Sequence, residues 1–224
     1  MLHYHGTPIT PMHKLLRMQG RNFCVSFAAP ADLKRCLSIG QSVMFDNGAF
    51  SAFTKGKPFD EAAFYAWVEP NLGHPHWAVI PDVIDGSEEE QRRMVGRWPF
   101  NRSLGLPVWH LGLSIDYLLY LAQTWERICF GSTAQYWEVG GDAWCNRMDE
   151  AFNALSKRHT KLPWIHGLRM LGMAGMRWPL ASADSTNIAQ NHHIHGCPEC
   201  MAERIDAVQT PVAWVPHATQ GMLI

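Results

Sequence analysis

Short runs of apolar residues alternate with amphipathic segments from one end of the chain to the other. The runs are continuous rather than alternating with polar residues, which is typical of strands buried on both faces of a parallel sheet. We therefore predict eight short strands. They are Leu2–Gly6, Asn22–Ala28, Ser42–Asp46, Trp77–Pro81, Pro107–Leu111, Arg127–Gly131, Trp164–Leu168 and Leu180–Ala183.

The segments between these runs carry helix signals. The clearest begins at Ser87, where three glutamates follow the serine and predict a capping box that suits the helix dipole. Strands that alternate with helices predict an α/β fold, here a (β/α)8 TIM barrel. A doubly wound open sheet is the alternative, although no Gly-x-Gly-x-x-Gly motif follows the first strand. The predicted helices are Pro11–Met18, Ala31–Leu37, Asp60–Val68, Ser87–Val95, Ser114–Trp125 and Ala143–Arg158, with a brief turn at Ala174–Trp178.

Composition indicates one globular domain. The chain has 224 residues, of which 47% are hydrophobic and 17% charged, so the disordered class is excluded. This length suits a single barrel domain over residues 1–224. Because 19 basic residues nearly balance 20 acidic ones, overall charge does not indicate a polyanionic partner, and a nucleic-acid site must be a local patch.

The sequence predicts a cytoplasmic protein without a membrane partner. No window approaches the roughly 18 consecutive apolar residues of a membrane span. Residues 1–15 contain three histidines and two prolines, which is unlike a secretory signal. The six cysteines are irregularly spaced, unlike a disulfide framework, so we expect a reducing compartment. Four of them are expected in the core: Cys24, Cys36, Cys129 and Cys145.

A cluster of histidine and cysteine near the C-terminus predicts a structural Zn²⁺ site. Two thiolates and two imidazoles form a tetrahedral set that zinc prefers, and four protein ligands leave no position for a reactive water. In a reducing compartment a Cys-x-x-Cys motif also indicates metal binding or redox chemistry. The zinc-binding segment spans about residues 188–217, with His192 and His193 as alternatives to His195. The predicted ligands are His195, Cys197, Cys200 and His217.

Three aspartates stand at the ends of predicted strands. Catalytic groups of a parallel barrel lie at the carboxyl ends of its strands, so Asp46, Asp82 and Asp184 are expected to converge on one face. A single aspartate in such a position often only caps the next helix. Three such aspartates beside small residues favour a catalytic site at the strand ends. Asp85 is the alternative to Asp82 as the functional carboxylate.

The stretch Asp46-Asn47-Gly48-Ala49-Phe50 resembles the Asp-Ser-Gly-Gly-Phe motif of the tRNA-guanine transglycosylase superfamily. From about residue 42 to the end, further segments follow in the order of that family: 107–112, 131–132, 164–172, 183–187 and the metal cluster. The compact size is most similar to the phage-type deazapurine DNA-modification transglycosylases, the DpdA family. There are departures. His195 replaces a cysteine ligand of the family, the spacing to His217 is shorter, and Trp109 or His110 stands where the family has a glutamine.

The resemblance implies a pentosyltransferase that replaces guanine in DNA with a 7-deazaguanine (preQ0-type) base. Asp184 is then the nucleophile that forms a covalent glycosyl intermediate, and Asp46 is the proton-transfer group. Asp82 is expected to accept hydrogen bonds from the purine, which must first leave the helical stack. The other substrate-binding residues are Phe50, Trp109, His110, Gly131 and Gly167, and the phosphate-binding residues are Lys55 and Lys57.

Other functions stay open at this point. The same guanine exchange on tRNA, of the queuosine type, is the first alternative to DNA. A (β/α)8 hydrolase of nucleosides or sugars would use the same three carboxylates, and a zinc-bound interaction module would use none of them. The sequence also leaves open a homodimer or a helper protein that completes the site, within a bacterium or a phage-infected host.

Overall fold

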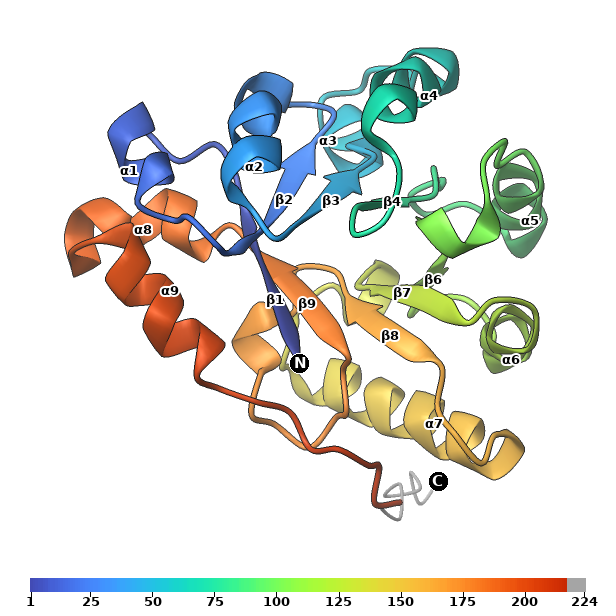
Figure 1. The fold of residues 1–224 in the computed structure, drawn as a ribbon. Coiled ribbons are helices and arrows are strands. Elements are labelled where there is room, and N and C mark those ends of the chain that lie inside the picture. Colours follow the sequence, from blue (N-terminus) through green and yellow to red (C-terminus); the bar gives the residue numbers. More distant parts are fainter. Residues whose placement is uncertain (217–224) are drawn as a thin grey trace.

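The computed structural model describes residues 1–216 and has a wholly parallel sheet at its centre, surrounded by helices (Figure 1). The strand order is β5-β4-β3-β2-β1-β9-β8-β7-β6, so β1 and β9, from the two ends of the chain, pair side by side. All eight predicted strands are present. The bounds are β1 Leu2–Gly6, β2 Asn22–Ser26, β3 Ser42–Asp46, β4 Trp77–Val79, β5 Gly105–Leu106, β6 Val108–His110, β7 Arg127–Gly131, β8 Trp164–Gly167 and β9 Ser182–Ser185.

The sheet is a nearly closed barrel, because its two outermost strands are consecutive in the chain. β5 pairs with β4 and β6 pairs with β7, and only Pro107 separates β5 from β6. Proline has no N–H to donate to a ladder, so the strand is interrupted at this position. Its carbonyl still accepts a hydrogen bond from Cys129 N at 2.8 Å. The single strand predicted at Pro107–Leu111 is therefore two short strands.

Helices connect most of the strands and cover the outside of the barrel (Figure 1). The capping box predicted at Ser87 is present, with Ser87 and Glu90 bonded to each other's backbone N–H groups. Three helices, α3, α8 and α9, were not predicted. The chain turns at Ala174–Trp178 as predicted, directly after a short 3-10 helix at Leu171–Met173. The bounds are α1 Met12–Leu16, α2 Leu33–Ile39, α3 Ala49–Thr54, α4 Glu61–Val68, α5 Glu88–Gly96, α6 Ile115–Thr124, α7 Asp142–Arg158, α8 Asn187–His195 and α9 Pro198–Asp206.

Alternating residues along each strand face two separate parts of the core. One set packs outward against the helices, as Phe23, Phe45 and Phe130 do. The other set fills the barrel interior. Three of the four cysteines expected in the core are fully buried there or beneath α2, and Cys145 is partly exposed. The interior set comprises Tyr4, Cys24, Met44, Trp77, Val79, Leu106, Val108 and Cys129.

The last two helices form a hairpin that packs against β1. Asp206, at the end of α9, accepts a hydrogen bond from Arg21 Nη1 at 2.6 Å and contacts His5 Nε2 at 3.0 Å. His3 Nδ1 lies 3.7 Å from the same carboxylate. The zinc-binding segment predicted at about residues 188–217 is thus largely helical rather than a loop, and ion pairs fasten it to the barrel.

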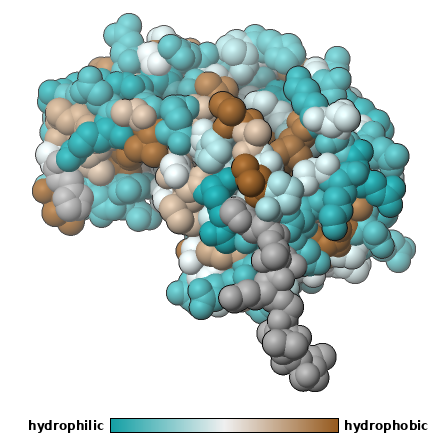
Figure 2. All heavy atoms as spheres, turned by 90° about the horizontal axis from the view of Figure 1, so that it is seen from below, coloured by the Kyte–Doolittle hydropathy of each residue, from teal (hydrophilic) through white to brown (hydrophobic). Residues whose placement is uncertain are grey.

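The surface is mainly polar. Figure 2 shows the molecule from below, where hydrophilic residues predominate and hydrophobic ones lie in small separate groups. None of the helices in residues 1–216 is long and apolar enough to cross a lipid bilayer.

Closure of the barrel depends on a small residue at the start of β5. A Cβ atom on Gly105 would lie 2.5 Å from Trp98 Cε2, and Trp98 is itself buried. We expect Gly105→Ala to lower the free energy of unfolding by about 1–3 kcal/mol through overpacking, measured by urea denaturation. The control is Gly96→Ala in α5, where a Cβ meets nothing within 4 Å. It should leave stability unchanged or slightly raised, and equal losses in both variants would contradict the prediction.

Candidate active site

A cavity of about 290 Å³ opens at the carboxyl ends of the strands. Asp46, Asp82 and Asp184 all line it, so the three strand-end aspartates lie together as the sequence analysis expected. The volume is at the lower end of the range for small-molecule sites, which suits a ligand of the size of one nucleobase or one sugar. Inward-facing residues of neighbouring strands supply the cavity walls, since parallel strands bring their carboxyl ends to one rim.

Asp184, on β9, is held by two donors. His166 Nε2 lies 3.2 Å from Asp184 Oδ1, and the backbone N–H of Arg169 donates to the same oxygen at 2.8 Å. Oδ2 takes part in neither bond. The two hydrogen bonds therefore fix the orientation of the carboxylate through Oδ1 and do not involve Oδ2.

Asp46, at the end of β3, has a different environment. Burial raises the pKa of its carboxyl to about 6, and the charges of Asp184 and Asp82 add to that shift. A hydrogen bond from Ser26 and the charge of Arg169 oppose it. A carboxyl with a pKa near 6 can hold or release a proton close to neutral pH, which is the property of a general acid or base.

Asp82, beyond β4, is held by a neighbouring amide and imidazole. Asn47 Nδ2 donates to Asp82 Oδ1 at 2.7 Å and to the Ile80 carbonyl at 3.0 Å. His110 Nε2 lies 2.7 Å from Asp82 Oδ2 as an ion-pair contact, and neither buried nitrogen of His110 makes a hydrogen bond among the described residues. Gly48 follows Asn47 with φ of 75°, a conformation that favours glycine and that starts α3.

Several other predicted residues also line the cavity. Phe50 is one, and the Arg169 guanidinium lies 3.9 Å from its ring centre. Lys55 and His110 line it as well. A Cβ atom on Gly131 would lie 3.1 Å from His110 Nδ1, so this glycine leaves space beside the imidazole.

Three predicted residues lie elsewhere. Trp109 faces away from the barrel interior, because adjacent strand positions face opposite sides of the sheet. It is fully buried there, and its Nε1 donates to the Ser114 carbonyl at 3.0 Å. The structure therefore assigns His110, not Trp109, to the cavity. A Cβ on Gly167 would meet Met170 Cβ at 2.8 Å, so this glycine makes room for packing and not for a ligand. Lys57 is exposed and, like Asp85, is not part of the lining.

The sequence analysis missed four polar residues that organise the cavity. His166 and Ser182 are buried inside the barrel, and their positions in the strand alternation would have indicated that they face inward. Asn47 was visible within the Asp46 motif without an assigned role. Nothing in the sequence pattern singled out Arg169, whose φ of 58° turns its N–H towards Asp184.

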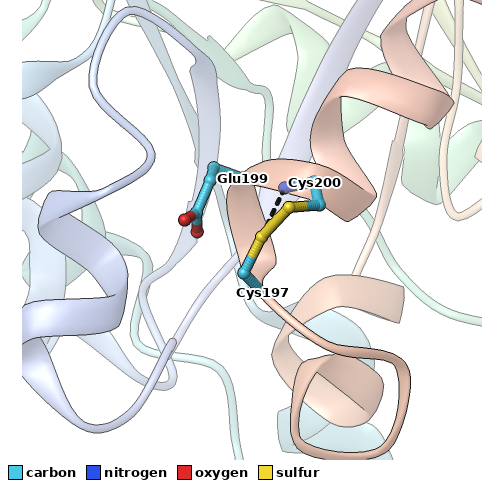
Figure 3. A group of neighbouring side chains, drawn as sticks. All are labelled: Cys197, Glu199 and Cys200. Carbon is cyan, nitrogen blue, oxygen red and sulfur yellow. Dashed lines mark hydrogen bonds between the residues drawn. A yellow bond between two sulfur atoms is a disulfide. The ribbon is translucent and has the colours of Figure 1, made fainter.

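The predicted metal ligands are only partly described. Cys197 and Cys200 come together at the start of α9, as their spacing predicts, but their sulfurs form a disulfide (Figure 3). Glu199 lies near them, and one ligand atom from each of these three residues lies within 4.8 Å of the others. Glu199 also forms an ion pair with Arg17. His217 lies outside the described residues, and so does the side chain of His195.

The raised pKa of Asp46 predicts a pH dependence of stability. As pH rises from about 4 to 6, the unfolded chain ionises this carboxyl before the folded protein does, so the wild type loses stability. The asparagine of Asp46→Asn cannot ionise, so this variant does not lose stability in this way. We expect the free energy of unfolding of Asp46→Asn minus that of the wild type to be about 2–3 kcal/mol higher at pH 7 than at pH 4. Urea denaturation at both pH values measures this difference.

The control for this measurement is Gly96→Ala, which changes no titratable group. Its stability relative to wild type should stay constant over the same pH range. If Asp46→Asn also shows a constant difference, the buried carboxyl does not titrate as described.

Comparison with known proteins gives no family for this chain. No protein-family model, curated protein or solved structure matches it. The chemistry of the cavity and the sequence resemblance therefore carry the functional argument.

Proposed function

We propose that the protein is a base-exchanging transglycosylase on a (β/α)8 TIM-barrel framework, which replaces guanine in DNA with a 7-deazaguanine. The observation that carries this proposal is the contrast between two carboxylates in one cavity. Asp184 is fixed by two donors, whereas burial raises the pKa of Asp46 to about 6. Enzymes that form glycosyl intermediates need such a pair, one carboxylate as nucleophile and the other as proton carrier.

The reaction follows from these two environments. Asp184 Oδ2 attacks C1′ of the target nucleotide, and the bond from C1′ to guanine N9 breaks. Guanine leaves with the bonding electrons and takes a proton from Asp46. The incoming deazapurine then gives its N9 proton to the Asp46 carboxylate and attacks C1′, which releases Asp184. Protons and charges balance over the two steps, so the exchange needs no external oxidant or reductant.

The cavity walls suit a planar heterocycle. Phe50 and the guanidinium of Arg169 form a stacked pair at its edge. Asp82, oriented by Asn47, presents a carboxylate acceptor for purine N–H groups, and Lys55 stands at the rim for a phosphate. Because the three aspartates line a cavity, they cannot reach C1′ of a nucleotide within the helical stack, so the target nucleotide must be turned out of the duplex.

We further propose that reduced Cys197 and Cys200 bind a structural Zn²⁺ together with His195 and His217. The two Cα atoms are 5.3 Å apart at the start of α9. Cysteine binds zinc as a free thiolate, so the disulfide and the metal-bound form of this pair exclude each other. The metal would fasten the segment after β9 and supply no reactive group.

Exchange of labelled guanine or 7-deazaguanine tests the first proposal, with duplex DNA, single-stranded DNA and tRNA as substrates. Asp184→Ala should lower the exchange rate by about 10³-fold or more, because it removes the nucleophile. Wild-type protein should also form a denaturant-resistant adduct with the nucleic acid, which Asp184→Ala cannot form. Asp85→Asn is the matched control and should exchange normally.

The outcomes separate the alternatives. Exchange on tRNA alone would move the proposal from DNA to tRNA. Release of free base without incorporation would identify a hydrolase. Full activity in Asp184→Ala would contradict the mechanism itself.

Metal analysis tests the zinc proposal. Protein purified under reducing conditions should contain about one zinc per chain. Cys200→Ser should lose this metal, and chelation should lower the melting temperature of the wild type, because metal binding adds to folding stability. Cys145→Ser, a free and partly exposed cysteine, is the control and should keep the zinc. Reduced wild type without zinc would contradict the proposal.

A further inference from the structure

His166 lies inside the barrel with no exposed surface. Its ring stands among three aromatic rings, with centroid distances of 5.0 Å to Trp77, 5.9 Å to Tyr4 and 6.2 Å to Trp164. A polar ring in such surroundings is unfavourable unless its nitrogens are hydrogen-bonded. Both nitrogens are, which indicates a role that an apolar residue of similar size could not fill.

His166 is on β8, which lies beside β9 (Figure 1). Its two hydrogen bonds reach successive inward positions on β9. Nδ1 lies 2.6 Å from Ser182 Oγ, and Nε2 lies 3.2 Å from Asp184 Oδ1. An ionised carboxylate can only accept, so Nε2 carries the proton and Nδ1 accepts from the Ser182 hydroxyl. We call this chain, Ser182–His166–Asp184, the carboxylate relay. It holds the imidazole in one tautomer.

The relay works together with one backbone group. Arg169 N–H also donates to Asp184 Oδ1, from a residue whose φ of 58° is in the left-handed region. Residues other than glycine seldom adopt this conformation, and those that do are concentrated at functional sites. With both donors on Oδ1, the carboxylate cannot turn without breaking a hydrogen bond.

We propose that His166 is a positioning residue, which through the carboxylate relay fixes the orientation of Asp184 so that Oδ2 faces the reacting carbon. This inference rests on the proposed function, in which Asp184 is the nucleophile. Reactions of this kind are sensitive to placement, and a misplacement of about 1 Å can lower the rate by about 100-fold.

Substitutions of His166 test the role in catalysis. His166→Leu should lower kcat of base exchange by about 100-fold and change KM for the free base by less than about threefold. His166→Gln can donate from near the Nε2 position, so we expect kcat within about tenfold of wild type. Ser182→Ala should give an intermediate loss. His76→Gln is the control, a partly buried histidine outside the cavity lining whose Nδ1 accepts from Val43 N–H, and should exchange normally.

Thermal denaturation of every variant shows whether it is folded. Folded His166→Leu with normal kcat would overturn the inference while leaving the proposed function intact. Equal losses of kcat in folded His166→Leu and His166→Gln would overturn it too.

A second measurement needs no substrate. ¹⁵N NMR of the histidine rings should show His166 as the Nε2–H tautomer in the wild type, and Asp184→Ala should change its spectrum. If wild-type protein exchanges no base on DNA or tRNA, the proposed function fails, and the NMR result alone decides the relay. An Nδ1–H tautomer, or a His166 spectrum insensitive to Asp184→Ala, would then overturn it.

Discussion

The placement of three carboxylates in one small, poorly solvated cavity is the constraint on which the rest of this site depends. Ionised groups that share a poorly solvated space raise each other's energy unless hydrogen bonds or opposite charges stabilise them. Asp184 receives two donors, and Asp82 has Asn47 and His110 beside it. Asp46 has the hydrogen bond of Ser26, which burial outweighs, and its pKa rises to about 6. The unequal support gives chemically identical side chains different capacities to carry a proton.

The barrel interior makes this arrangement effective. Aromatic and aliphatic side chains fill the barrel interior, and two of these residues, Cys24 and Val79, also line the cavity. Burial also raises the pKa values of the Cys24 and Cys129 thiols well above their usual value, which keeps both thiols uncharged and unreactive. His166 is the polar group that passes through this apolar layer, and it does so with both nitrogens bonded. The relay therefore runs from Ser182 in the barrel interior to Asp184 in the cavity wall.

The α8–α9 hairpin follows Asp184 directly and shows how the far end of the chain supports the site. Asp206 joins the end of α9 to Arg21 and to the histidines of β1. β1 pairs with β9, the strand that carries Asp184. A structural metal in the hairpin would thus reinforce a segment that protein contacts already attach to the barrel. In the proposed reaction the metal would help to hold β9 in place and would take no part in the chemical steps.

The sequence by itself indicated where the strands lie along the chain and that they are parallel, because buried parallel strands have continuous apolar runs. It also determined that Asp46, Asp82 and Asp184 lie at strand ends, which in a parallel sheet form one rim. Only the tertiary structure decided which neighbouring side chains face that rim. It put His110 in the cavity and Trp109 outside it, and it joined Cys197 to Cys200. Side chains along a strand alternate between its two faces, but a shift of one residue in register moves every side chain to the opposite face. Only the packed barrel fixes that register.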